Sequence, residues 1–182
     1  MRPTRRVLTA LLGTVAATGL ALAGTPAQAV PVNTSSHPVS AVSTAGSGHR
    51  ILAKLTHAQS TAKFRSAGIT WTSSGGCSDR NNPSCTSFDQ LNSATADGAV
   101  TLKSASGCAI RLTGGTETGH ASGTYSHWNG YKLDMSLSSC LDNYITGTFT
   151  SIGGSKWKSA SGNVYYREGN HWDVTYYNCG GC

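Results

Sequence analysis

Apolar residues recur with helical spacing in four stretches of the chain. The first covers residues 49–68, where Gly68 is the kind of residue that commonly closes a helix. Residues 86–94 begin with a Thr-Ser pair that can cap a helix, and residues 99–107 end in another glycine. The last stretch runs from Cys140 to about residue 152, with its apolar side chains on one face. The pattern therefore predicts four helices.

Runs of β-forming residues predict strands between these stretches. Residues 69–72 are rich in β-forming side chains, and residues 108–113 alternate apolar with polar positions. Near the C-terminus, residues 163–168 and 171–177 flank the pair Gly169-Asn170, which is a signal for a tight hairpin turn. The chain is therefore expected to form a mixed domain with a C-terminal hairpin.

The N-terminal part has the composition of an export signal followed by a linker. Residues 1–29 combine arginines, an apolar run and the exit Ala27-Gln28-Ala29, which is typical of a removable secretory signal. These residues leave open whether export follows the general or the twin-arginine route. Residues 30–48 are rich in Ser, Thr, Pro and Val and predict a flexible linker, so residues 49–182 form the expected domain. No later apolar stretch is long enough for a membrane span, and we expect a secreted, extracellular product.

The charge distribution does not favour a nucleic-acid partner. The formal net charge is +6, and subtracting the three arginines of the signal leaves +3. The remaining basic residues are scattered along the chain and do not form the clusters that mark nucleic-acid binders.

All six cysteines lie in the exported part and predict three disulfides. Their connectivity is open, although closeness in sequence suggests three pairs: Cys77 with Cys85, Cys179 with Cys182, and by elimination Cys108 with Cys140.

Acidic side chains are scarce, and half of them stand near histidines. The chain has only eight aspartates and glutamates. Two short segments combine acids with histidines: Glu117 and Asp134 with His120 and His127, and Glu168 and Asp173 with His171. Such a concentration of titratable groups points to a functional site.

The expected hairpin gives the second segment a geometry. Glu168 faces His171 directly across the turn, so that a carboxylate and an imidazole meet on one face. A surface Glu–His pair without function is the alternative for these two residues taken alone.

The first segment needs a bend. His127 and Asp134 are seven residues apart, which would place them on opposite faces of an uninterrupted strand. Gly130 lies between them and can supply a bulge or turn, followed by a strand over residues 131–135.

One carboxylate and two imidazoles suit a catalytic zinc ion, which keeps a fourth position open for water. His127, Asp134 and His171 are therefore candidate ligands for one zinc ion per chain. Glu168 is then available as the general base that takes a proton from this water and returns it to the leaving amine. A His-His-Asp set also tolerates other divalent ions.

The pattern His127-x-x-Gly130-x-x-x-Asp134, followed by Glu168-x-x-His171, resembles the zinc signature of the D-alanyl-D-alanine metallopeptidases. The wider group also holds the lysostaphin-type peptidases and the hedgehog signalling domain. The resemblance implies that the two histidines and the aspartate bind zinc and that Glu168 is the catalytic acid/base. It also implies a small, single α+β domain with a central antiparallel sheet flanked by helices, here stapled by disulfides.

The resemblance spans roughly residues 108–177 and has departures. Family members often carry Ser two residues before the first ligand and Ala two residues before the Asp, where this chain has Tyr125 and Lys132. Glu117 stands where members often have an Arg that steadies substrate charge. A carboxylate cannot grip a free C-terminus, which argues against strict carboxypeptidase action. Endopeptidase and D,D-carboxypeptidase action both stay open.

Four further residues are candidates for substrate contact or for orienting a ligand. His120 lies in a Gly-rich loop and can contact substrate or stabilise an oxyanion. Asp173 points to the same side as His171 by strand alternation and can orient a ligand. Ser126, directly before the first ligand, and Glu117 complete the set.

These observations lead to the hypothesis of a secreted, monomeric zinc metallopeptidase that hydrolyses amide bonds in peptidoglycan stem or cross-link peptides. The alternative is a non-hydrolytic, zinc-containing module that binds cell wall or a protein partner, although the intact Glu168 argues against it. A third hypothesis is a metal-free, disulfide-stapled inhibitor or adhesion domain. Metal content and turnover of peptidoglycan fragments distinguish the three.

Overall fold

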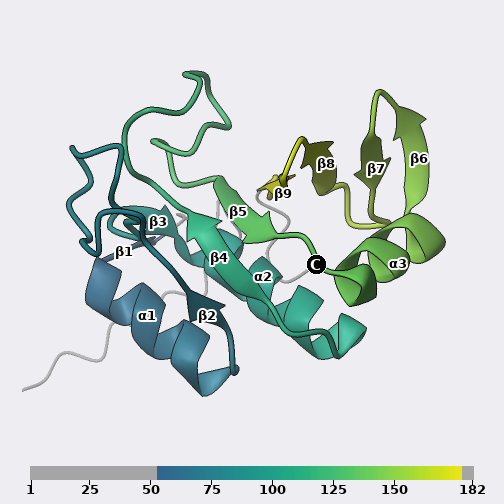
Figure 1. Ribbon diagram of the computed structural model, residues 1–182, viewed down its shortest axis with the longest axis horizontal. Coiled ribbons are helices and arrows are strands. Elements are labelled where there is room, and N and C mark those ends of the chain that lie inside the picture. Colours follow the sequence, from purple (N-terminus) through teal and green to yellow (C-terminus); the bar gives the residue numbers. More distant parts are fainter. Residues whose placement is uncertain (1–52, 178–182) are drawn as a thin grey trace, which may run out of the picture. The chain divides into compact units, whose positions relative to one another are not determined.

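A computed structural model describes residues 53–177 of the chain (Figure 1). The predicted signal at residues 1–29, the linker at residues 30–48 and the pair of Cys179 with Cys182 lie outside the described residues, as do the first four residues of the helix predicted over 49–68.

Seven strands form the main sheet: β2 (Thr70–Trp71), β4 (Arg111–Gly114), β5 (Lys132–Ser136), β6 (Thr150–Gly153), β7 (Lys156–Lys158), β8 (Val164–Glu168) and β9 (His171–Thr175). Their order across the sheet is β2-β4-β5-β9-β8-β7-β6. Neighbours are antiparallel except β2 and β4, which run parallel. Together with three helices this sheet confirms the α+β class, and the parallel pair at one edge is a departure from a wholly antiparallel sheet.

The strands predicted from the sequence are present with small shifts of their ends. The predicted segments 69–72, 108–113 and 131–135 contain or overlap β2, β4 and β5. The C-terminal hairpin is formed by β8 and β9 around Gly169-Asn170, as predicted. A separate antiparallel pair joins β1 (Lys54–Leu55) to β3 (Leu91–Asn92).

The first helix, α1 (His57–Ser66), begins later than the predicted range of 49–68. Thr56 starts it with a capping box: its hydroxyl accepts from the N–H of Gln59, and the Gln59 side chain accepts from the N–H of Thr56. The two residues before this cap are extended because they form β1. Gly68, with a φ of 69°, follows the end of the helix, as predicted.

The helix predicted over residues 86–94 is wrong, because only its last two positions are helical. Two N–H groups of this segment donate instead to side chains distant in sequence, Glu117 and His57. One continuous helix, α2 (Ser93–Ser106), begins after β3 and therefore starts well before the predicted range of 99–107. It ends at Gly107, whose φ of 66° is left-handed, as predicted.

The last helix, α3 (Ser139–Thr148), is shorter than the predicted range of 140–152. The residues of the predicted range that follow Phe149 are not helical and belong to β6, which pairs with β7 at the edge of the sheet. The hydroxyl of Ser138 caps the start of α3 by accepting from the N–H of Leu141.

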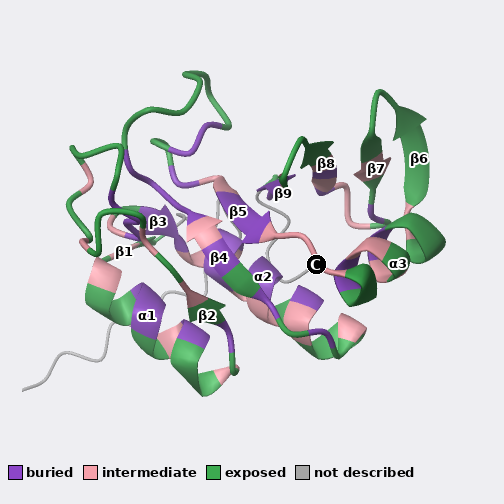
Figure 2. Ribbon diagram, viewed as in Figure 1, coloured by how far each residue is buried: buried purple, intermediate pink, exposed green. Residues whose placement is uncertain are grey.

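All three helices contribute to one apolar core (Figure 2). Phe64 comes from α1, Leu102 from α2 and Ile145 from α3, and each is buried with side chains of the central strands. Leu133 of β5 and Val174 of β9 are fully buried in the same cluster. Because side chains alternate along a strand, the residues next to Leu133 in β5 and next to Val174 in β9 point to the other face of the sheet.

Two disulfides lie within the described residues and confirm two of the suggested pairs. Cys77–Cys85 closes the polar loop between its cysteines. Cys108–Cys140 joins the segment before β4 to the first turn of α3 across 32 positions of sequence. Disulfides of this kind fit an extracellular protein. Within residues 53–177, no helix combines the length and apolarity needed to cross a membrane.

Candidate metal centre

One face of the sheet carries the charged side chains of the candidate site. Along β5, Leu133 and Met135 are fully buried in the core, so Asp134 between them points to the opposite face. On the neighbouring strand, Asp173 lies opposite Asp134 in the antiparallel register. His171, two residues before Asp173, faces the same side.

The β8–β9 hairpin adds the carboxylate of Glu168. Glu168 lies opposite His171 in the strand register, as predicted from the two-residue turn. Oε2 of Glu168 is 3.9 Å from Nε2 of His171. The side chain of Glu168 is 52% exposed, whereas that of His171 is 27% exposed, so the carboxylate stands at the solvent edge of the site.

A tight turn before β5 brings in His127. Gly130 has a φ of 76°, a conformation that favours glycine, and its N–H donates to the carbonyl of His127. A side chain at Gly130 would also collide with the backbone of residues 90–92. The bend predicted at this glycine is confirmed, and it places the imidazole of His127 beside Asp134.

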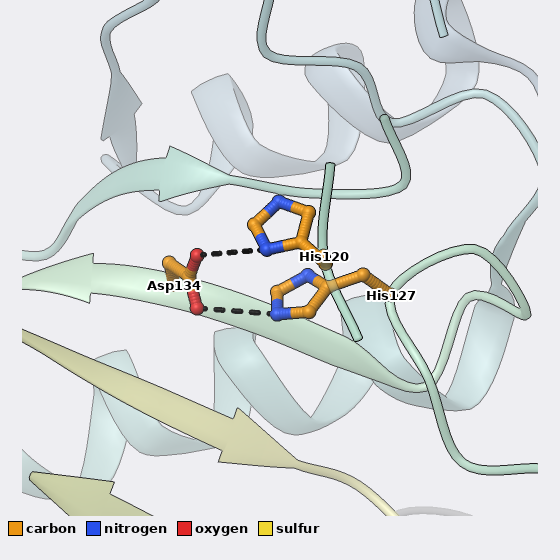
Figure 3. Close-up of side chains that lie close together, drawn as sticks. All are labelled: His120, His127 and Asp134. Carbon is orange, nitrogen blue, oxygen red and sulfur yellow. Dashed lines mark ion pairs between the residues drawn. The ribbon is translucent and has the colours of Figure 1, made fainter. Parts of the chain in front are cut away.

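Three histidines converge on the two oxygens of Asp134, and Figure 3 shows two of them, His120 and His127. Oδ1 lies 3.2 Å from Nε2 of His127 and 3.5 Å from Nε2 of His171. Oδ2 lies 3.8 Å from Nδ1 of His120. The rings of His120 and His127 are stacked, with centroids 3.8 Å apart, and each directs a nitrogen at a different oxygen of the carboxylate.

Hydrogen bonds from the far side of two rings orient the nitrogens that face Asp134. Nδ1 of His127 lies 2.6 Å from the carbonyl oxygen of Gly115, and Nδ1 of His171 lies 3.1 Å from Oδ1 of Asn170. In both rings Nδ1 therefore faces an oxygen atom, and Nε2 faces Asp134. This is the arrangement found in metal-binding histidines.

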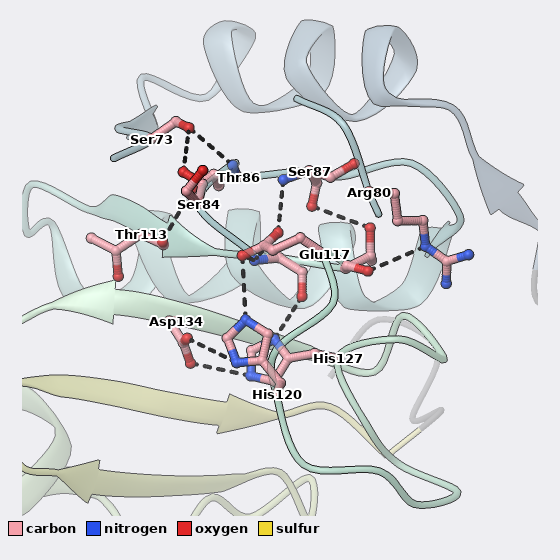
Figure 4. Close-up of polar contacts among 12 residues, drawn as sticks. Ser73, Arg80, Ser84, Thr86, Ser87, Thr113, Glu117, His120, His127 and Asp134 are labelled. Carbon is pink, nitrogen blue, oxygen red and sulfur yellow. Dashed lines mark hydrogen bonds and ion pairs between the residues drawn. The ribbon is translucent and has the colours of Figure 1, made fainter. Parts of the chain in front are cut away.

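Glu117 holds the third histidine in the same way (Figure 4). Its buried carboxylate accepts from the N–H groups of Ser87 and Gly115, and it lies 3.3 Å from Nε2 of His120. Burial acts to raise the pKa of Glu117, but these hydrogen bonds outweigh it and the pKa lies below its usual value. The hydrogen bond to Glu117 in turn raises the pKa of His120, against the effect of burial.

The atoms at the centre of the group are buried without a hydrogen-bond partner among the described residues. They include Nε2 of His127 and Oδ1 of Asp134. Burial acts to raise the pKa of Asp134, but contact with His127 and the charges of the surrounding histidines lower it below its usual value. Asp134 is therefore held as a carboxylate, the form that binds metal ions.

These side chains line one cavity of about 260 Å³. Its walls include all four residues of the predicted zinc signature and two of the four additional candidates: His127, Asp134, His171 and Glu168, with His120 and Asp173. Lys132 also lines it, with Nζ 2.7 Å from Oδ2 of Asp173. That Oδ2 is 3.9 Å from Nε2 of His127, so Asp173 lies between the lysine and the candidate ligands.

The other two candidates do not line this cavity. Ser126 is buried in the turn before β5, where its hydroxyl accepts from the N–H of Asn129. Glu117 lies behind His120 and contacts the site only through that ring. Both residues therefore shape the site and do not face its cavity.

His120, His127 and Asp134 form a group that can hold a metal ion, since one donor atom from each lies within 4.8 Å of the others. His171, the predicted third ligand, is not part of this group, but its Nε2 lies 3.5 Å from Oδ1 of Asp134.

Several supporting residues were not predicted from the sequence. Gly114 lies opposite Asp134 in the register of β4 and β5, and an added side chain there would overlap Oδ2 of Asp134. The carbonyl of Gly115 and the side chain of Asn170 orient two of the histidines. The adjacent Gly114-Gly115 pair was the available signal, because glycines often mark close approach within a strand.

No protein-family model, curated protein or solved structure matches this chain. The functional argument therefore rests on the residues and geometry of the site.

Proposed function

We propose that the protein is a zinc metallopeptidase that hydrolyses amide bonds in peptidoglycan stem or cross-link peptides, with His127, Asp134 and His171 as ligands. One observation carries the proposal: the Nε2 atoms of two imidazoles lie 3.2 and 3.5 Å from the same oxygen of a buried aspartate.

Two of the spacings in this ligand set match those of a zinc site. With zinc–ligand distances of about 2.0–2.1 Å, adjacent donor atoms of a tetrahedral site lie about 3.3 Å apart. Oδ1 of Asp134 has neighbours at nearly this distance on two sides, His127 and His171. His120 faces the other oxygen, Oδ2, at 3.8 Å, and in this proposal it lies on the substrate side of the centre.

The chain provides the acid/base group separately from the ligands. Glu168 lines the same cavity, yet its side chain is 52% exposed and only the 3.9 Å approach to His171 ties it to the site. An exposed carboxylate of this kind is free to take a proton from water and pass it to the leaving amine. When bound, zinc supplies a Lewis acid for the carbonyl and makes water a nucleophile near neutral pH.

Metal analysis and turnover together test the proposal. We expect about one zinc per chain in the wild-type protein, its loss in His127→Ala, and its retention in Glu168→Gln. Glu168→Gln should lower turnover of peptidoglycan fragments by about a hundredfold or more. His57→Asn is the matched control, because His57 lies outside the cavity and its replacement should change neither the zinc content nor the turnover.

Three results would contradict the proposal. One is the absence of metal in folded protein, and another is wild-type cleavage by Glu168→Gln. The third is a zinc-loaded protein that sediments with sacculi and releases no product, which is the behaviour of a non-hydrolytic binding module.

A further inference from the structure

A second cavity adjoins the candidate metal centre. It has a volume of about 250 Å³ and shares Gly119, His120 and Ala121 with the first cavity. His120 thus contributes to both cavities, and a ligand that extends from one to the other passes along its ring. Trp128, the residue next to His127, also lines this second cavity.

The Trp128 ring is held in place but remains open to solvent. The guanidinium carbon of Arg80 lies 3.6 Å from its ring centroid. Arg80 is itself fixed, since it donates from Nε to the carbonyl of Thr116 and from the guanidinium to the carbonyl of Trp128. Nevertheless, Trp128 is 44% exposed, one of the largest exposures of a big apolar side chain among residues 53–177.

The remaining walls of this second cavity are small and mostly uncharged. They include the polar residues Thr118, Ser122, Ser126 and Asn129. One wall residue is acidic: Glu117 is buried, and its carboxylate already forms hydrogen bonds with Ser87, Gly115 and His120. No lysine or arginine lines the cavity among the described residues. The nearby guanidinium of Arg80 is engaged by the Trp128 ring and by two carbonyl groups, so the lining of the cavity suits a neutral ring that bears hydroxyl and amide groups.

We propose that Trp128 forms a subsite for a pyranose ring, and that the substrate is a stem peptide still attached to an N-acetylated amino sugar. A pyranose presents C–H groups on its faces, which pack on the electron-rich face of an aromatic ring. The cavity's hydroxyl, amide and backbone groups then meet the polar substituents at the ring's edge. This inference rests on the proposed peptidase function, because it identifies the sugar end of that enzyme's substrate.

Kinetics on two matched probes test the subsite. The probes are N-acetylglucosaminyl-N-acetylmuramyl-tetrapeptide and the same tetrapeptide with an acetylated N-terminus. For the wild-type protein we expect a KM about tenfold lower for the sugar-linked probe, with similar kcat. Trp128→Ala should raise the KM of the sugar-linked probe to that of the free tetrapeptide, and an unchanged circular dichroism spectrum shows that the variant folds. Ile152→Ala, a truncation of another exposed apolar side chain on β6, should keep the difference.

A binding measurement separates the subsite from the peptidase. Calorimetric titration with the disaccharide alone should give heat of binding in the wild type and none in Trp128→Ala. If neither probe is cleaved but this binding is present, the subsite stands and the peptidase proposal fails. Equal KM for both probes, or equal loss on both in Trp128→Ala, overturns the subsite alone. Should Trp128→Ala fail to fold, Trp128→Met, which keeps apolar volume without a flat ring, replaces it in both measurements.

Discussion

The carbonyl oxygen of Gly115 lies 2.6 Å from Nδ1 of His127. This contact orients the ring of His127 so that its Nε2 faces Oδ1 of Asp134, 3.2 Å away. The same short segment also supplies the N–H of Gly115 to Glu117, which holds His120. One glycine of β4's extension thus orients two histidines of the site through its backbone.

The neighbouring glycine leaves room for the carboxylate. An added methyl group at Gly114 would overlap Oδ2 of Asp134, so Gly114→Ala should displace that side chain. We expect zinc affinity to fall by about tenfold to a hundredfold, as measured by competition with a chromophoric chelator. Gly147→Ala is the control, because Gly147 lies in α3 with no atom near its added methyl group. Equal affinities of the two variants would show that Asp134 is not placed by this contact.

The ligand assignment predicts unequal effects for two histidines. His171→Ala removes a nitrogen 3.5 Å from Oδ1 of Asp134, whereas His120→Ala removes one 3.8 Å from Oδ2. We expect His171→Ala to abolish stoichiometric zinc binding and His120→Ala to retain about one zinc per chain with lower peptidase activity. Elemental analysis after dialysis measures both variants. The reverse order would assign the metal to His120, His127 and Asp134.

Glu117 is predicted to matter for stability as a buried anion. Its carboxylate accepts from two backbone N–H groups and His120, and the amide of Glu117→Gln would turn a donor toward one of these donors. We expect the free energy of unfolding to fall by about 1–3 kcal/mol in urea titrations of the metal-free protein. Glu168→Gln, at a half-exposed position, should change it by less than about 0.5 kcal/mol. Similar losses in both variants would contradict the role given to Glu117.

The environment of His57 leads us to expect a loss of stability on mild acidification. Its Nδ1 accepts from the N–H of Phe88 at 3.1 Å, and it can do so only when unprotonated. Burial lowers the pKa of His57 and the charge of Arg65 acts in the same direction, while Asp89 and Glu117 oppose them. The imidazole of His57 therefore binds a proton at higher pH in the unfolded chain than in the folded chain. As a result, the free energy of unfolding falls as the pH drops through the pKa of the unfolded chain, near 6.5.

A variant that accepts the same hydrogen bond without titrating isolates this effect. The Oδ1 of Asn can take the place of Nδ1, so His57→Asn should lose less stability than the wild type between about pH 7 and pH 5. Urea unfolding across this range measures the difference. Parallel curves for the two proteins would mean that His57 does not contribute to the acid sensitivity.

Local patterns predicted those parts of the fold whose causes are local. The hairpin of β8 and β9 follows from a two-residue turn between β-forming runs, and its register alone places Glu168 opposite His171. Gly130 was identified as a bend because two residues of opposite strand parity had to meet. By contrast, residues 86–92 have helical periodicity but are not helical. Their backbone is bound by Glu117 and His57, about thirty positions away in sequence.

The sequence by itself determined the residue types of the centre, the hairpin that carries Glu168 and His171, and the bend that brings His127 toward Asp134. Each depends on spacing within a few residues, where strand alternation and turn geometry leave little choice. Only the tertiary structure decided which groups surround these side chains. Burial of Glu117 beneath His120, the Gly115 carbonyl behind His127 and the exposed Trp128 ring over Arg80 all depend on packing between segments distant in sequence. Such contacts form because buried polar groups need hydrogen-bond partners, which can come from distant parts of the sequence. The periodicity of apolar residues does not indicate which groups will pair.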